Sequence, residues 1–178
     1  MKVIAIADDD SMVGKLPTGS VDLLLCLGDL WDTTIEAAYL RYQPTRTFAV
    51  KGNHDSASEF PPFVTPLHFT LKKHLGLSFG GFGGSWRYKP KGHHLFEQHD
   101  VKRMLQSFPR VDVFIAHNSP RGIHERDDHT HQGFDGFLAY ILANQPRLFI
   151  HGHQHVNQIT RIGKTEVVSV FGEMSLEI

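Results

Sequence analysis

Five short apolar segments recur along the chain, and each is followed at once by polar residues. They are Val3–Ala7, Val21–Leu27, Phe48–Val50, Val111–Ala116 and Leu148–Ile150. Unbroken runs of apolar and β-branched residues of this length are typical of strands that are covered on both faces. Because segments of helical composition lie between them, the pattern predicts a layered α/β domain.

Three segments have the composition of helices: Thr33–Tyr42, Asp100–Phe108 and Gly133–Asn144. Thr33 or Thr34 is the expected cap of the first. Ser56-x-x-Glu59 matches a capping box that would open a short helical turn, and Pro61 and Pro62 would stop that turn early.

The remaining apolar segments predict hairpins and loops. His68–His74 and Leu77–Phe82 suggest a β-hairpin that turns around Leu75-Gly76. Gln158–Ile162, Thr165–Phe171 and Met174–Ile178 look like antiparallel strands that Gly163 and Gly172 separate. The polar stretches 86–98 and 121–132 are expected to be loops.

Composition narrows the class of protein. The 178 residues, 40% of them hydrophobic, suit one compact domain over residues 1–178. Eighteen basic and nineteen acidic residues leave the chain near neutral, which argues against binding to extended nucleic acid. A small phosphorylated substrate remains compatible with this charge.

The chain carries no signal for export or for membrane insertion. Only a short apolar run precedes Asp8, and nowhere do roughly 18 apolar residues follow one another. Cys26 is the single cysteine, so no disulfide framework exists. We therefore expect a cytoplasmic protein without a membrane partner, and the sequence leaves its oligomeric state open.

The polar residues after the five strands are those that bind metal ions. In chain order they are Asp8 and Asp10, Asp29, Asn53 and His54, His117, and His153 and His155. The carboxyl ends of strands in an open α/β sheet meet at one edge, where ligands bind. Oxygen and nitrogen donors without a thiolate suit Mn²⁺, Fe or Zn²⁺ better than a structural zinc site.

Each of these motifs also has an ordinary structural interpretation. Asp8-Asp9-Asp10 would cap a turn that leads to Ser11, and Gly52-Asn53-His54-Asp55 would be a loop in which Asp55 and Ser56 cap the next turn. Gly152-His153-Gln154-His155 would present two surface histidines. Agreement among five strand ends favours a metal site over these separate interpretations.

In this order, Asp8-Asp9-Asp10, Gly28-Asp29, Gly52-Asn53-His54-Asp55, His117 and Gly152-His153-Gln154-His155 resemble the motifs of the calcineurin-like metallophosphoesterase superfamily. The resemblance implies a four-layer α/β/β/α sandwich of two mixed β-sheets flanked by helices. Gly83–Tyr88 and the segment from His117 to Phe134 look like the small single-domain phosphodiesterase branch.

The resemblance also implies two divalent cations, with Mn²⁺ expected first and Fe, Zn or Ni possible. It assigns one cation to Asp8, Asp10, Asp29 and His155, and the other to Asn53, His117, His153 and the shared Asp29. Asp10 stands where the family has a histidine. Either this carboxylate binds the first metal, or it caps the turn and leaves the first site weak.

The implied activity is hydrolysis of nucleotides or other small phosphodiesters by a metal-bridging hydroxide. His54 would be the general acid, and Asp32 matches the acidic residue that orients it in some members. Asn53, Arg87, Arg121 and His131 are candidate substrate contacts, although the last three are equally compatible with solvated loops. The alternative is a non-catalytic protein-interaction scaffold on the same fold with a decayed first metal site.

Overall fold

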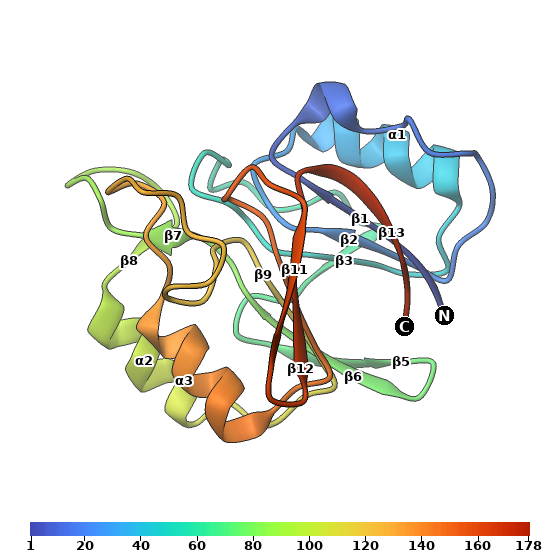
Figure 1. Cartoon of the computed structure of the whole chain (residues 1–178). Helices are drawn as coiled ribbons and strands as arrows, with labels where there is room; N and C mark the ends of the chain where they lie inside the picture. The colour runs from blue at the N-terminus through green and yellow to red at the C-terminus, as the bar shows by residue number, and fades with distance from the viewer.

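A computed structural model describes all residues from Met1 to Ile178. Two mixed β-sheets pack face to face, one helix covers the outer face of the first sheet, and two helices cover the outer face of the second (Figure 1). This arrangement confirms the four-layer α/β/β/α sandwich expected from the sequence.

The first sheet has five strands in the order β13-β1-β2-β3-β4. Their bounds are β1 (Lys2–Ala7), β2 (Leu23–Cys26), β3 (Thr47–Ala49), β4 (Val64–Pro66) and β13 (Gly172–Glu177). Strands β1 to β4 are parallel, and β13 pairs antiparallel with β1, so the two ends of the chain lie side by side (Figure 1). Helix α1 (Asp32–Tyr42) lies on this sheet.

The second sheet has six strands in the order β11-β12-β10-β9-β6-β5. Their bounds are β5 (Leu71–His74), β6 (Leu77–Phe82), β9 (Val113–Ala116), β10 (Leu148–His151), β11 (Gln158–Ile162) and β12 (Thr165–Ser169). The four inner strands are parallel, and the edge strands β5 and β11 are antiparallel to their neighbours. Helices α2 (Gln98–Gln106) and α3 (Asp135–Asn144) cover it, and β7 (Ser85–Trp86) pairs with β8 (Leu95–Phe96) nearby.

Residues of β1 show why these strands read as continuous apolar runs. Val3, Ala5 and Ala7 belong to the core between the two sheets, whereas Ile4 and Ile6 belong to the core under α1. Successive side chains of a strand point to opposite faces, so a strand covered on both sides needs apolar residues at every position. A third core cluster fills the space between the second sheet and helices α2 and α3.

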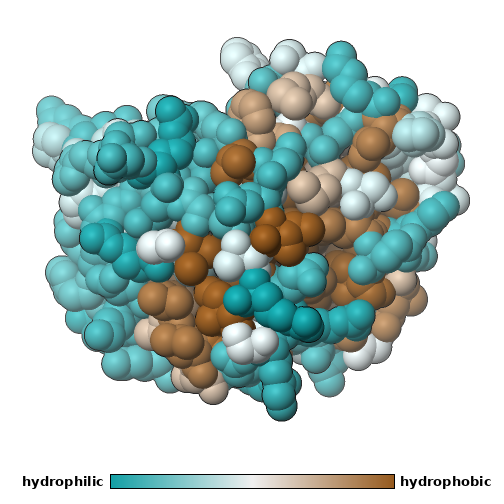
Figure 2. Space-filling view, in the orientation of Figure 1, coloured by the Kyte–Doolittle hydropathy of each residue, from teal (hydrophilic) through white to brown (hydrophobic).

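The surface of one broad face is mixed. Figure 2 shows apolar residues gathered toward the middle of this face, with polar residues around them. None of the helices is both long and apolar enough to cross a bilayer.

Local expectations were wrong at three places. Helix α1 begins after Trp31, which makes no side-chain cap, so neither Thr33 nor Thr34 caps it. No helix follows Ser56, because the segment to Glu59 forms bends only. The last strand does not pair with β12; the chain crosses between the sheets after Ser169, and β13 pairs with β1 instead.

Candidate metal centre

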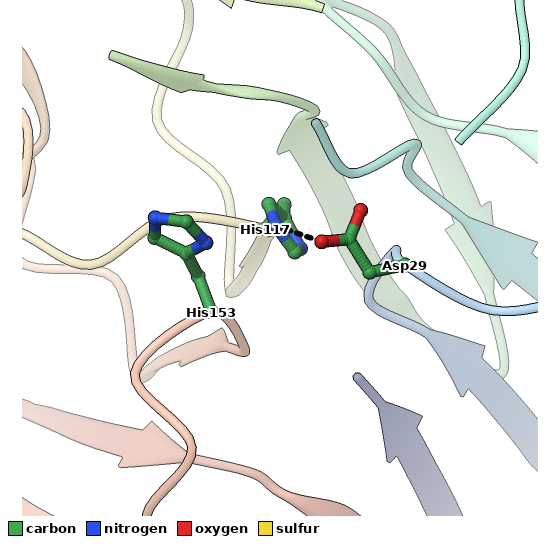
Figure 3. A group of neighbouring side chains, drawn as sticks. All are labelled: Asp29, His117 and His153. Carbon is green, nitrogen blue, oxygen red and sulfur yellow. Dashed lines mark ion pairs between the residues drawn. The ribbon is translucent and has the colours of Figure 1, made fainter. Parts of the chain in front are cut away.

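Loops from both sheets meet at the carboxyl ends of the parallel strands. Asp29 follows β2 of the first sheet, and His117 and His153 follow β9 and β10 of the second. One ligand atom from each of these three residues lies within 4.8 Å of the other two (Figure 3). Both sheets of the sandwich therefore contribute to a single cluster.

His117 is the buried centre of this cluster. Its Nδ1 lies 2.8 Å from the carbonyl oxygen of Leu27, so Nδ1 carries a proton and donates it to that carbonyl. Its Nε2 lies 3.4 Å from Asp29 Oδ2 (Figure 3). The same nitrogen lies 3.0 Å from Asn53 Oδ1. A backbone carbonyl that fixes one ring nitrogen leaves the other available to a metal ion.

The charges of Asp29 and His117 depend on each other. Burial alone would raise the pKa of Asp29, but the charge and hydrogen bond of His117 hold it below its usual range. Burial opposes protonation of His117, yet attraction to Asp29 raises its pKa to about 9. Without a cation, the imidazolium of His117 thus supplies the positive charge that the carboxylate requires.

The Asp29 carboxylate is also oriented by backbone. Its Oδ1 accepts a hydrogen bond of 2.7 Å from the amide of His54, while Oδ2 faces His117. The two oxygens therefore have different partners, a backbone amide for Oδ1 and the buried imidazole for Oδ2.

Asp8 presents an unpaired buried oxygen. Its side chain is 1% exposed, and its Oδ2 accepts a hydrogen bond of 2.9 Å from the amide of His153. Its Oδ1 has no hydrogen-bond partner, and His155 Nε2 lies 3.9 Å away. Burial, with a further contribution from Asp29, raises the pKa of Asp8 to about 7.

These observations fit divalent cations. A buried carboxylate oxygen without a partner is costly, and a cation between Asp8 and His155 would satisfy it. Burial and the nearby charges of His117 and His131 lower the pKa of His153 far below its usual range. His153 is therefore neutral, which is the form that binds metal.

The backbone at this edge is held in unusual conformations. Asp8, Asp29, His153 and His155 all have positive φ, at 65°, 53°, 67° and 50°. Non-glycine residues rarely adopt this region, and such strain gathers at functional sites. It aims four of the expected ligands out of their strand ends.

Asp10 is not one of the three residues of the cluster. It opens a 3₁₀ turn (Asp10–Met12), and its Oδ1 accepts a hydrogen bond of 3.1 Å from the Trp31 amide. The cap of that turn is Asp9, whose Oδ1 accepts from the amide of Ser11 at 2.9 Å. Asp10 thus connects the loop after β1 with the loop after β2.

His54 and Asp32 lie at a hollow next to the cluster. Both are exposed and line, together with Asp29, a hollow of about 450 Å³. No hydrogen bond joins the two side chains. The expected pair therefore shares a space but makes no direct contact in this conformation.

The expected substrate contacts differ in position. The ring centre of His131 is 4.9 Å from that of His153, and its Nδ1 lies 2.7 Å from Asp128 Oδ1. Arg87 pairs with Glu97 at 3.0 Å. Arg121 lies 3.9 Å from Glu125 and 4.0 Å from Asp135.

Sequence reasoning missed the role of Asp55. It does not cap the following turn; its carboxylate accepts hydrogen bonds from the amides of Gly52, Asp29 and Leu30, at 2.7, 3.0 and 3.1 Å. It thus fastens the loop after β3 to the loop after β2. The Gly52-Asn53-His54-Asp55 motif includes Asp55, but it does not indicate that the partners of its carboxylate are these three amides.

Tyr88 was also missed. Its hydroxyl accepts a hydrogen bond of 3.3 Å from Asn53 Nδ2, while Asn53 Oδ1 faces His117. Tyr88 therefore fixes which end of the amide points at the cluster. It is the last residue of Gly83–Tyr88, and the resemblance of that stretch to the small single-domain phosphodiesterase branch implied no role for the Tyr88 side chain.

The model of the calcineurin-like phosphoesterase family matches residues 6–157, which include every residue of the cluster. The chain belongs to the calcineurin-like phosphoesterase family. Members of this family are metal-dependent hydrolases, which agrees with the donor set found here. No curated protein matches the chain in sequence.

Solved structures share the fold at low sequence identity. The protein TT1561 of Thermus thermophilus is 14% identical with a TM-score of 0.65, over 96% of this chain and 89% of that one. Phosphopantetheinyl hydrolase from Mycobacterium tuberculosis is 13% identical with a TM-score of 0.59, over 96% and 89%. Vps29 from Entamoeba histolytica, solved with Zn²⁺, is 14% identical with a TM-score of 0.53, over 97% and 74%.

Proposed function

We propose that this phosphoesterase uses two divalent cations, manganese before iron, zinc or nickel, to hydrolyse phosphodiesters of nucleotides or other small molecules. The observation that carries the proposal is the buried, unpaired Oδ1 of Asp8 beside the cluster of Asp29, His117 and His153. A protein that bound no cation would gain nothing from burying this oxygen without a partner.

The chain offers a donor set for each cation. Asp8, Asp29 and His155 would hold the first, with Asp10 as a further oxygen donor, and Asn53, His117, His153 and the shared Asp29 would hold the second. When bound, the pair supplies Lewis acidity to the phosphoryl oxygens and lowers the pKa of water.

Residues of the chain would orient the substrate and move the proton. We propose that His54 donates a proton to the leaving oxygen, a role that is typically worth 10²- to 10⁴-fold in rate. Asp32 lines the same hollow and would orient the His54 ring once a substrate brings the two together. His131, held by Asp128, is the candidate contact to a phosphoryl oxygen. Arg87 and Arg121 would have to leave their carboxylate partners to reach a substrate.

The proposal is tested by hydrolysis of bis(p-nitrophenyl) phosphate beside p-nitrophenyl phosphate. Metal-stripped protein is assayed with Mn²⁺, Fe²⁺, Zn²⁺, Ni²⁺ or Mg²⁺ added back. We expect turnover that depends on Mn²⁺ and favours the diester. Absence of turnover with every metal would refute the proposal and favour the scaffold.

His54→Ala separates catalysis from metal binding. We expect the variant to keep the metal content of the parent and to lose 10²- to 10⁴-fold in turnover of a diester with a poor leaving group. If the variant loses its metals, or hydrolyses that diester as fast as the parent, His54 is not the general acid.

A further inference from the structure

An exposed tryptophan lines the hollow that holds His54. Trp31 is 73% exposed and borders the 450 Å³ space together with Asp29, Asp32, Lys51 and His54. Tryptophan is on average among the more buried residues, so a solvent-exposed indole beside a candidate catalytic group calls for a reason.

The backbone of Trp31 is fixed while its ring is unengaged. Its amide donates to Asp10 at 3.1 Å, directly before helix α1. Its indole makes no hydrogen bond and stacks on no other ring. Trp86 differs, since its Nε1 donates to the carbonyl of His129 at 2.8 Å and its ring packs against the His129 ring.

The hollow has the size and the polar groups of a small-molecule site. Its volume lies within the range of about 300 to 1,000 Å³ that is usual for ligand pockets. Around the indole, Lys51, Thr33 and Ser56 can donate hydrogen bonds to a ligand. One large aromatic face with donors around it suits a flat ring that carries acceptors.

We propose that Trp31 is the stacking platform for a flat heteroaromatic ring of the substrate, namely a nucleobase. This base would belong to the ester group that lies on the His54 side. The platform rests on the proposed function, because it names the substrate class of the same site. It favours nucleotide diesters over diesters of small aliphatic alcohols.

A second cavity competes for the same ring. It has a volume of about 550 Å³, shares Lys51 with the first, and is lined by apolar residues that include Phe60, Val64 and Phe96. Neither Asp29 nor His54 lines it, so a ring held there would lie in a different cavity from these two residues. Trp31 is therefore the better placed platform.

The test compares the affinities of adenosine 5′-monophosphate and ribose 5-phosphate, in which a hydroxyl group takes the place of the base. Both are titrated by calorimetry with and without added Mn²⁺, and quenching of tryptophan fluorescence is followed in parallel. We expect the base to tighten binding roughly 5- to 100-fold and to quench fluorescence. Trp31→Ala should remove this preference, and Trp31→Phe should retain part of it.

Two control variants test where the nucleobase binds. Leu40→Ala removes a side chain that is 66% exposed on helix α1, which begins directly after Trp31, and should leave the preference intact. Ala57→Phe, which narrows the apolar cavity, should also leave it intact. If Trp31→Ala keeps the preference, or Ala57→Phe alone removes it, the platform is refuted.

The diester assay on the same proteins separates the two proposals. Metal-dependent turnover without any preference for the base would refute the platform alone. Binding of adenosine 5′-monophosphate that depends on Trp31, without turnover by any metal, would support the platform and refute the phosphodiesterase.

Discussion

Asp55 is not an expected metal ligand, yet its carboxylate accepts hydrogen bonds from three backbone amides of the site. The loop after β2 and the loop after β3 each present amides to its carboxylate. These amides have no other partner, and Asp29 itself belongs to one of the two loops that Asp55 joins. The position of the Asp29 carboxylate thus depends on Asp55, for which the motif alone indicates no such role.

Replacing Asp55 should therefore loosen the site. We expect Asp55→Ala to lower the free energy of unfolding by about 1–3 kcal/mol, because three amides lose their acceptor. Asp55→Asn keeps one acceptor oxygen and should lose less. Urea unfolding of the metal-stripped proteins measures the difference, and an Asp55→Ala variant as stable as the parent would contradict this role.

The His117 imidazolium gives the metal-free protein a specific pH dependence. Its pKa rises from the usual 6.5 to about 9 on folding, so the stability it provides is complete below pH 6.5 and is lost as the pH rises to about 9. Two other buried groups affect stability below pH 6.5. Burial raises the pKa of Asp8 to about 7, which makes stability fall as the pH rises. Burial lowers the pKa of His151 to about 3, which makes stability rise with pH, so the two contributions oppose each other.

We expect the free energy of unfolding of metal-stripped protein to fall between about pH 6.5 and 9, by roughly 1.4 kcal/mol for each unit of pKa shift. His117→Gln should remove most of this slope, leaving only the contribution of Asp8 up to about pH 7. In the presence of Mn²⁺ the slope should reverse, because a cation competes with the proton on His117. Equal slopes for the parent and His117→Gln, measured by urea unfolding, would refute the assignment.

At the scale of elements, the strand ends approach one another so closely that only glycine fits between them. A side-chain carbon on Gly28 would lie 2.5 Å from the amide nitrogen of Gly52 and 2.7 Å from His117 Nδ1. A side-chain carbon on Gly52 would collide with the carboxylate of Asp29. Both glycines precede an expected ligand, so the same contact that excludes a side chain brings the ligands together.

Gly52→Ala should displace Asp29. We expect the variant to fold with reduced stability and to lose most of its metal affinity, since both cations of the proposed site would share that carboxylate. Gly76→Asn is the control, because nothing lies within 4 Å of Gly76 and asparagine tolerates its φ of +82°. Metal content after dialysis is the measurement. A Gly52→Ala variant with normal metal content would show that the loops can separate without cost.

Strands covered on both faces were the most predictable part of the fold. Each needs apolar residues throughout, so β1, β2, β3, β9 and β10 are visible as apolar runs, and their carboxyl ends locate Asp8, Asp29, Asn53, His117 and His153. The antiparallel hairpin of β5 and β6 also formed as expected around Leu75 and Gly76. These features depend on local pattern, which a sequence displays directly.

Contacts between distant segments were not predictable. The pairing of β13 with β1 joins the two ends of the chain, and no local pattern distinguishes it from pairing with β12. Likewise, the link from Asp10 to the Trp31 amide and the contact of Tyr88 with Asn53 depend on where loops meet. The motifs indicated the candidate ligands, but not the side chains that orient them.

At the scale of the whole molecule, the sandwich places one half of the site on each sheet. Asp8, Asp29 and Asn53 come from the first sheet, and His117, His153 and His155 come from the second. Cations bound between them would join the two layers at their shared edge. Metal binding and the packing of the sheets should therefore stabilise each other.

The number of bound ions tests this arrangement most directly. Metal-stripped protein is titrated with Mn²⁺ by calorimetry, with Asp29→Ala, Asp10→Ala and Asp10→His in parallel. We expect two ions per chain for the parent, none held tightly by Asp29→Ala, and a weakened first site in Asp10→Ala. A parent that binds no ion, or one ion that becomes two only in Asp10→His, would contradict a binuclear site and indicate a decayed one.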